Sequence, residues 1–178
     1  MSKETSLPEL DLALNLRVQQ FYNHEAEVLD DRRFREWLAL FDKEATYRMP
    51  IRRTVPPRER KVEFTGPSDL SIFDENYEDL SQRIAKLETG KAWAEEPPSR
   101  TRHCVSNVRV RRDGDKLAVR SNFIIFQGRF ERDSHVYYGE KHDLLKESPS
   151  GVFGLAVAER LILLDHTTLE VPAVSIFF

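Results

Sequence analysis

Three nitrogen-rich side chains lie close together in one short stretch of this 178-residue chain, from Ser99 to Val108. Arg100, Arg102 and His103 follow a Pro-Pro loop and lead into a run that is typical of a strand. Guanidinium groups bind carboxylates through paired hydrogen bonds, and an imidazole can transfer protons near neutral pH. The stretch therefore predicts either an active site at the mouth of a sheet or a surface for assembly with another chain.

A general acid–base site is the enzymatic interpretation that the residue types leave open. Tyr, His and Asp side chains around an enclosed cavity could move protons on a small carbonyl substrate, as in a stand-alone dehydratase or isomerase. The candidates are Tyr47, His103, His135 and Asp143. The competing interpretation packs Tyr47 into the sheet and gives the histidines only structural hydrogen bonds or partner contacts. An interior filled by Phe, Ile and Leu would exclude the enzyme.

The sequence shows no recognisable pattern for binding a metal or a nucleotide. None of the five histidines forms an H-x-x-x-H pair, and the single cysteine, Cys104, excludes a Rieske cluster, which needs two Cys and two His. An iron site made of two scattered histidines and a carboxylate stays open. Seven glycines form no phosphate-binding loop, and there is no G-x-S-x-G motif. We expect Cys104 to be a small buried apolar residue.

A formal net charge of −3 gives the chain no overall field that would attract nucleic acid or an anionic membrane. Arginines cluster locally, at residues 52–60 and again at residues 109–112. Because no aromatic residues alternate with them, we interpret both clusters as solvated or subunit-facing surface. The chain lacks an apolar run of about 18 residues, so we expect no membrane span, and one cysteine fits the cytoplasm.

The sequence pattern predicts that the first half of the chain is mainly helical. Apolar residues recur on one face from Leu10 to Leu29, and a second stripe runs from Phe34 to Phe41 after a capping pair at Asp30 and Asp31. A third helix is predicted from Tyr77 to Leu87, stopped at Gly90. Residues 1–9 are expected to form a flexible tail.

The sequence pattern predicts that the second half consists of long strands joined by turns. Asp113-Gly114 is a strong hairpin signal, Pro50 suggests a strand end or edge, and Gly128 suggests a bulge. Strands are predicted at residues 45–51, 105–111, 116–132, 135–146, 153–164 and 173–178, with a short one near residues 62–64. Helices followed by a strand meander indicate an α+β domain, residues 1–178, in which N-terminal helices cover one long, curved antiparallel sheet. The expected shape is a cone.

Three large aromatic residues lie at positions where water would reach them unless another surface covers them. Trp93 lies in a charged, Pro-rich loop, and Phe177 and Phe178 end the sequence. Trp and Arg are enriched at subunit interfaces, which favours an interface for Trp93 over a satellite core position. We expect the two terminal Phe residues to be buried in a similar way.

Several motifs together resemble the β (small) subunit of bacterial aromatic-ring-hydroxylating dioxygenases, with the biphenyl, toluene and phenylpropionate branch nearest. The resemblance covers roughly residues 17–178. It rests on the Ser99–Val108 stretch and on Glu25-Ala26, Leu29-Asp30-Asp31-Arg32, Trp37-Leu38-Ala39-Leu40-Phe41, Tyr47-Arg48-Met49-Pro50-Ile51-Arg52, Trp93 with Glu96 and Pro97, Gly139-Glu140-Lys141 with Asp143, and the terminal Phe pair.

The resemblance implies a cone-shaped fold of the nuclear transport factor 2 and scytalone dehydratase type. It implies a partner α subunit that carries a Rieske 2Fe–2S cluster and a mononuclear iron, in an assembly of three α and three β subunits. That assembly adds both atoms of dioxygen to an aromatic ring, giving a cis-dihydrodiol. Electrons come from NAD(P)H through a reductase and often a ferredoxin. The β subunit itself is implied to have no catalytic, cofactor-binding or metal residue and to be mainly structural, in the bacterial cytoplasm.

With this resemblance, the charged stretch is better explained by assembly than by catalysis. We expect Arg100 and Arg102 to donate fork-shaped hydrogen bonds to carboxylates or carbonyls, within the chain or across a subunit boundary. His103 should begin a core strand. The predicted interface residues are Trp93, Arg100, Arg102, Phe177 and Phe178. The alternatives are the stand-alone acid–base enzyme and a homo-oligomeric binding domain without an oxygenase partner.

Overall fold

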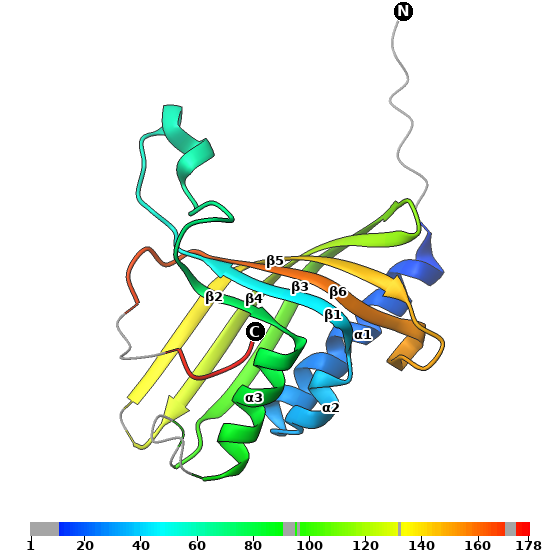
Figure 1. Cartoon of the computed structure of the whole chain (residues 1–178), viewed down its shortest axis with the longest axis horizontal. Helices are drawn as coiled ribbons and strands as arrows, with labels where there is room; N and C mark the ends of the chain where they lie inside the picture. The colour runs from blue at the N-terminus through cyan, green and yellow to red at the C-terminus, as the bar shows by residue number, and fades with distance from the viewer. Residues whose placement is uncertain (1–10, 91–94, 96, 132, 170–173) are drawn as a thin grey trace, which may run out of the picture.

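One six-stranded sheet organises the computed structural model, which describes residues 11–90, 95, 97–131, 133–169 and 174–178. The strand order is β2-β1-β6-β5-β4-β3, and Figure 1 shows the sheet bent over the three helices, which gather on one side of it. The elements are α1 (Leu12–Asp30), α2 (Phe34–Leu38), β1 (Phe41–Pro50), η1 (Pro57–Val62), β2 (Ser71–Asn76), α3 (Tyr77–Glu88), β3 (Arg100–Asp113), β4 (Lys116–Arg129), β5 (Asp133–Glu147), η3 (Val152–Gly154) and β6 (Leu155–Leu164).

Helix α1 forms where the apolar stripe predicts it. The side chain of Asp11 caps the helix by accepting a hydrogen bond from the Leu14 amide at 2.9 Å. The stripe faces the sheet and is buried, at Leu14, Val18, Phe21, Tyr22, Val28 and Leu29. Helix α2 is shorter than predicted, because it ends at Leu38 and Phe41 already begins β1. Trp37 and Phe41 still pack together, with ring centroids 4.8 Å apart.

The sheet is mixed, which corrects the prediction of a wholly antiparallel sheet. β3, β4, β5 and β6 pair antiparallel in succession, and β1 pairs antiparallel with β2 but parallel with β6. The Asp113-Gly114 turn is confirmed, with Gly114 at φ +60°. Pro50 ends β1, as predicted. The α+β class is confirmed.

Three local predictions fail. The register runs unbroken through Gly128, and the irregularity lies instead in β3 between Ser106 and Arg109, where Asn107 adopts φ +52°. Residues 62–64 form no strand beyond a single bridge from Phe64 to Arg52, and η1 precedes them. Residues 174–178 form no strand either.

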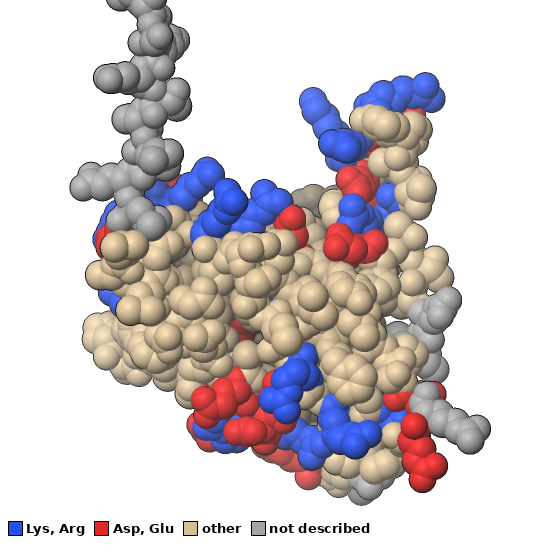
Figure 2. Space-filling view, turned by 180° about the vertical axis from the view of Figure 1, so that it is seen from behind, with Lys and Arg blue, Asp and Glu red and all other residues tan. Residues whose placement is uncertain are grey.

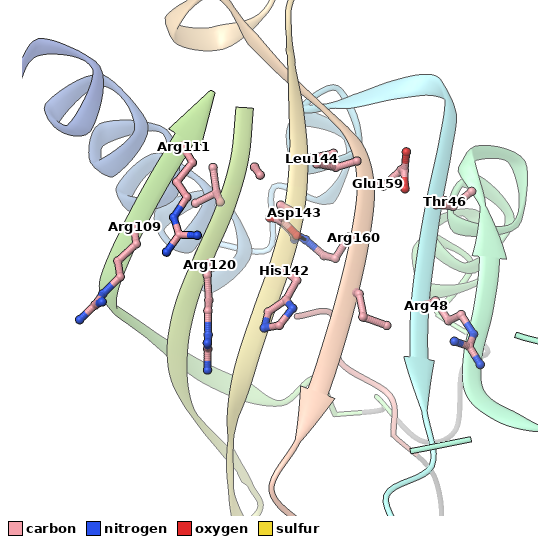
Figure 3. Close-up of a pocket in the computed structure, with 13 residues that line it drawn as sticks. Thr46, Arg48, Arg109, Arg111, Arg120, His142, Asp143, Leu144, Glu159 and Arg160 are labelled. Atoms are coloured by element: carbon pink, nitrogen blue, oxygen red, sulfur yellow. Dashed lines mark hydrogen bonds and ion pairs between the residues drawn. The ribbon is translucent and has the colours of Figure 1, made fainter. Parts of the chain in front are cut away.

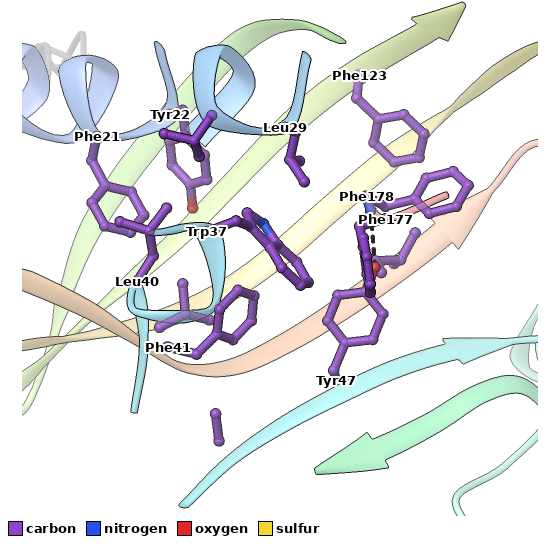
Figure 4. Packing of buried hydrophobic residues seen from close by; sticks show 14 of the residues in the cluster. Phe21, Tyr22, Leu29, Trp37, Leu40, Phe41, Tyr47, Phe123, Phe177 and Phe178 are labelled. Atoms are coloured by element: carbon purple, nitrogen blue, oxygen red, sulfur yellow. Dashed lines mark hydrogen bonds between the residues drawn. The ribbon is translucent and has the colours of Figure 1, made fainter. Parts of the chain in front are cut away.

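The last two residues lie in the core between the sheet and the helices. Phe177 and Phe178 are 2% and 0% exposed, and the ring of Phe177 lies 4.4 Å from that of Trp37. Phe178 packs edge-on against Phe123 and Tyr137. Figure 4 shows Phe177 and Phe178 among the buried side chains, with Trp37 and Phe123 nearby. The chain itself therefore buries both Phe residues, which corrects the prediction that they face a partner subunit.

Candidate functional site

The start of β3 is fastened to the end of α1 by a buried histidine and an aspartate. His103 Nδ1 lies 2.6 Å from Asp30 Oδ1, and the His103 amide donates to both carboxylate oxygens at 3.1 Å. The other ring nitrogen, Nε2, lies 3.1 Å from the carbonyl oxygen of Phe177. Both ring nitrogens are thus engaged within the chain. His103 is a core-strand residue, as predicted, and has no free nitrogen for a substrate or a metal.

Asp30 is the point at which four polar groups converge. Besides the two from His103, its carboxylate accepts a hydrogen bond from Thr101 Oγ1 at 3.2 Å and lies 3.3 Å from Arg102 Nη1. Burial raises the pKa of Asp30, but the hydrogen bonds and charge of His103 outweigh it and hold this pKa below its ordinary value. The arrangement stabilises the ionised carboxylate and locks a helix to a strand.

The two arginines of the stretch point into solvent. The Arg102 side chain is 73% exposed and makes one ion-pair contact, and Arg100 is exposed with no hydrogen bond among the described residues. The predicted fork-shaped bonds are therefore not formed within the described chain, and an interface role for both arginines stays a prediction. Trp93 lies outside the described residues. Cys104 is exposed, which corrects the prediction of a buried residue: it follows inward-facing His103, and strand neighbours alternate.

A polar network closes the mouth of the cone beside this strand. Glu95 Oε2 accepts from the Ser99 amide at 2.8 Å, and Glu95 Oε1 from the Ser99 hydroxyl at 2.9 Å. Gln127 Nε2 donates to the Ser99 hydroxyl at 2.9 Å, and the Tyr137 hydroxyl donates to Gln127 Oε1 at 2.9 Å. Burial, helped by the charge of Glu95, raises the pKa of Tyr137 to about 12. These groups satisfy one another and point at no ligand.

A cavity of about 290 Å³ adjoins the network, and Leu29, Phe34 and Phe177 are among the side chains that line it. Its ionisable lining groups include Glu95 and His103, which are already bonded within the chain. Ligand sites usually offer about 300–1,000 Å³ and free convergent polar groups. Among the described residues that line the cavity there is no free acid–base pair of the kind that the dehydratase interpretation requires.

The other acid–base candidates are not brought together. Tyr47 is fully buried, burial raises its pKa, and its hydroxyl accepts a hydrogen bond from the Phe178 amide at 2.9 Å (Figure 4). His135 and Asp143 both lie on β5, eight residues apart, which is about 26 Å along a strand. The four residues therefore form no common site.

Asp143 belongs instead to a buried ionic cluster, which we define as Tyr22, Glu25, Lys141, Asp143 and Arg160. Arg160 Nη2 lies 2.8 Å from Asp143 Oδ2 and 3.1 Å from Glu25 Oε2. Lys141 Nζ donates to Glu25 Oε2 at 2.9 Å, and the Tyr22 hydroxyl donates to Asp143 Oδ2 at 2.8 Å. Two cations and two carboxylates balance in the core between α1, β5 and β6.

The protonation states of the buried ionic cluster are fixed by mutual attraction. Burial raises the pKa of Glu25, but Arg160 and Lys141 outweigh it and hold this pKa at about 2. Burial lowers the pKa of Arg160, but Asp143 and Glu25 outweigh it and raise this pKa. Burial dominates at Lys141 and lowers its pKa below the ordinary value. Every member has a partner, so the cluster fixes structure and offers no free proton donor.

Sequence reasoning did not assign a role to Glu25, Lys141 or Arg160. A signal for Glu25 was present: it lies four residues after Phe21 and three before Val28, on the apolar stripe of α1. A charged residue in that register must find a buried partner of opposite charge. The partners on β5 and β6 become adjacent only when the sheet forms.

The outer face of the sheet, away from the helices, holds the larger hollow, of about 560 Å³. Figure 3 shows Arg109 and Arg111 on β3, Arg120 on β4, His142 on β5 and Arg48 on β1 around it. Among the described residues, no group of three or more His, Cys, Asp or Glu is placed to hold a metal ion. No helix in the described part is both long and apolar enough to cross a membrane.

Comparison with known proteins shows the family to which the chain belongs. The profile of the ring hydroxylating beta subunit family matches residues 24–171. This chain belongs to that family. It is 38% identical over 172 residues to the biphenyl 2,3-dioxygenase subunit beta of Rhodococcus jostii, covering 95% of this chain and 91% of that one. It is 38% identical to the benzene 1,2-dioxygenase subunit beta of Pseudomonas putida over 170 residues, which cover 94% and 90%.

Two solved structures have folds similar to that of this chain. A chain of naphthalene 1,2-dioxygenase superposes with a TM-score of 0.83 at 21% identity, covering 97% of this chain and 89% of that one. A provisionally named scytalone dehydratase from Novosphingobium aromaticivorans superposes with a TM-score of 0.64 at 16% identity, covering 92% of each chain. The predicted family and the dehydratase-like cone fold are both confirmed.

Proposed function

We propose that this beta subunit is a non-catalytic, structural component of an aromatic-ring-hydroxylating dioxygenase. The whole enzyme would convert an aromatic compound to a cis-dihydrodiol with dioxygen and electrons derived from NAD(P)H. The observation that supports a structural role is the filled interior: Tyr47, His103 and Asp143 are all buried and bonded within the chain. In this proposal the protein therefore acts through its surface, by contacts with other subunits.

The partner in this proposal is a large α subunit that carries a Rieske 2Fe–2S cluster and a mononuclear iron. Three α and three β subunits would form the complex, and a reductase with or without a ferredoxin would supply electrons to α. The names of the relatives support this assignment, because each is called the beta subunit of a dioxygenase. A cytoplasmic location and the exposed arginines Arg100 and Arg102 as interface residues belong to the same proposal.

The stand-alone dehydratase is the alternative that the cone fold would allow. It requires a free acid–base pair beside a substrate cavity, whereas Glu95 and His103, two of the ionisable groups described at the cavity, are already bonded within the chain. The observed packing therefore favours the structural subunit.

Coexpression with a large subunit of the family tests the proposal. The tagged large subunit should retain this chain, and the complex should form a cis-dihydrodiol from an aromatic such as biphenyl or benzene. The isolated chain should hold no iron and show no oxygenase activity. Stoichiometric iron in the isolated chain, or failure to join any large subunit of the family, would contradict the proposal.

A further inference from the structure

The hollow on the outer face of the sheet is lined by four arginines and a histidine that lie outside the apolar core. The strand register places Arg109, Arg120 and His142 in one row across β3, β4 and β5. Arg111 lies in the next row, and Arg48 on β1 completes the hollow (Figure 3). All five face away from the helices, so they contribute nothing to the apolar core.

The carboxylates near the hollow are already neutralised. Glu140 accepts two hydrogen bonds from Arg120, at 2.6 and 2.9 Å, and Glu159 pairs with Lys116 at 3.3 Å. Arg109 and Arg111 are exposed and have no carboxylate partner in the described part of the chain. The hollow therefore carries excess positive charge in a chain whose formal net charge is −3.

Arg48 joins this hollow to a projecting arm, which we define as residues 51–70. Its Nη2 donates to the carbonyl oxygens of Thr65 and Gly66, and its Nε is buried without a hydrogen-bond partner. The base of the arm is held by paired backbone and side-chain bonds between Ile51 and Thr65. The arm stands out from the body in Figure 1, anchored at its base.

The tip of the arm continues the positive surface. Arg58, Arg60 and Lys61 in and beside η1 are all exposed, and only Arg58 has a nearby carboxylate, Glu59 at 3.3 Å. In Figure 2, Lys and Arg gather along the margin of the molecule from which the arm rises. Hollow and arm together form one surface, which we call the basic cradle.

Protection of an edge strand explains only part of this charge. β3 is an edge of the sheet, and cations on an edge discourage pairing with other strands. Arg48, however, lies on β1, an inner strand, and the arm connects β1 to β2 at the other end of the strand order. The cradle thus spans strands that need no such protection.

We propose that the basic cradle holds an extended acidic segment of the large oxygenase subunit, an inference that rests on the proposed function. β3 and β1 are four strand spacings apart, so Arg109 and Arg48 are separated by about 19 Å across the sheet. A small anion cannot bridge that span, whereas about six residues of extended chain can. Paired guanidinium groups favour Asp and Glu side chains as the ligands.

Other occupants fit less well. A second copy in a two-fold contact would bring its own cradle against this one, and like charges would repel. A neighbouring β subunit around a three-fold axis would present a different surface to the cradle, and the oligomeric state of the isolated chain separates that outcome. A single-stranded nucleic acid needs aromatic stacking platforms, and the side chains lining the hollow are Thr, Arg, Ala, Val, His, Asp, Leu and Glu.

The test compares two variants that change the net charge equally. Arg109→Gln with Arg111→Gln removes two positive charges from the cradle. Lys86→Glu replaces one positive charge by a negative one at an exposed position of α3, on the helical side, so the net charge also falls by two. Each is coexpressed with the tagged large subunit, and the beta subunit retained is measured at low and high salt. We expect roughly tenfold less retention for the cradle variant, with weaker salt dependence, and wild-type retention for Lys86→Glu.

Thermal unfolding checks that both variants fold, and Arg58→Gln with Arg60→Gln provides a second cradle variant. Wild-type retention of both cradle variants would overturn the inference while leaving the proposed function intact. Failure of the wild-type chain itself to bind would instead refute the proposed function. A changed oligomeric state of the isolated cradle variant, with unchanged binding to the large subunit, would show that a second copy is the occupant and refute the proposal.

Discussion

Individual charged residues in this protein divide by burial into two kinds with opposite roles. Glu25 and Arg160 are each 1% exposed, and their charges are neutralised by neighbours within the core. Arg109 and Arg111 lie in solvent and are neutralised by nothing in the described chain. Removing a buried partner leaves an uncompensated charge in the interior, whereas removing an exposed one costs the fold little. Stability and assembly can therefore be tested with different residues.

Glu25→Gln should destabilise the protein by about 3–5 kcal/mol, because Arg160 and Lys141 would lose their shared carboxylate in the core. Urea unfolding followed by circular dichroism measures the change. Glu27→Gln is the matched control on the same helix, since Glu27 is 63% exposed in its pair with Arg33 and should cost about 0–1 kcal/mol.

The same variant should also change the response to acid. The pKa of Glu25 is about 2 in the folded chain and 4.5 ordinarily, so its stabilisation is complete above about 4.5 and is lost as pH falls towards 2. The difference in unfolding free energy between wild type and Glu25→Gln should shrink over that interval. A constant difference from neutral pH down to about 2 would contradict this assignment.

At the scale of helices and strands, the sequence predicted what depends on local pattern. The stripe of α1 and the Asp113-Gly114 turn were located correctly, because spacing and turn chemistry are local. β2 was missed, because Ser71–Asn76 has few β-branched residues and acquires its strand structure by pairing with β1. Phe41 continues the apolar spacing of α2, yet the helix ends at Leu38 and Phe41 is the first residue of β1.

The site was less predictable than the fold. His103 and Asp30 are 73 residues apart, and Glu25 and Arg160 are 135 apart. Such pairs have no short-range signal, so neither was predicted from the sequence, and the resemblance to a known family predicted the function without them. Residues 177 and 178 were expected at an interface because two terminal Phe side chains need to be covered, and the structure shows that the chain covers them in its own interior.

Close approach of β5 and β6 at Gly139 gives the element-scale prediction. A Cβ atom at residue 139 would lie 2.3 Å from the carbonyl oxygen of Leu163 and 2.8 Å from the ring of Phe123. Gly139→Ala should therefore cost about 1–3 kcal/mol in unfolding free energy. Gly66→Ala is the control, because its nearest neighbour would be an Asp69 carboxylate oxygen at 3.4 Å.

Chemical denaturation of both glycine variants measures this difference. If Gly139→Ala unfolds at the same urea concentration as Gly66→Ala, the two strands are not packed as tightly as the structure shows. A loss confined to Gly139→Ala supports the close contact.

For the whole molecule, the fold separates an interior whose charged and polar groups are paired from a surface that carries unpaired charges. The described core contains paired ions and packed aromatic rings, and the mouth of the cone is closed by hydrogen bonds around Glu95. The unpaired charges lie on the outer sheet face, on the arm and at the start of β3. A molecule of this design is suited to hold other chains in place, which is the role proposed for it in a dioxygenase.

Arg102→Ala should separate assembly from catalysis at this scale. Arg102 is 73% exposed and contacts Asp30 only at 3.3 Å, so the isolated chain should lose about 0–1 kcal/mol of stability. If Arg102 faces another subunit, less complex should form with the large subunit, while each assembled complex turns over at the wild-type rate. Arg112→Ala is closely matched, being 68% exposed with Asp11 at 3.4 Å, and should assemble normally. Loss of turnover in a fully assembled Arg102→Ala complex would instead place this stretch in the reaction itself.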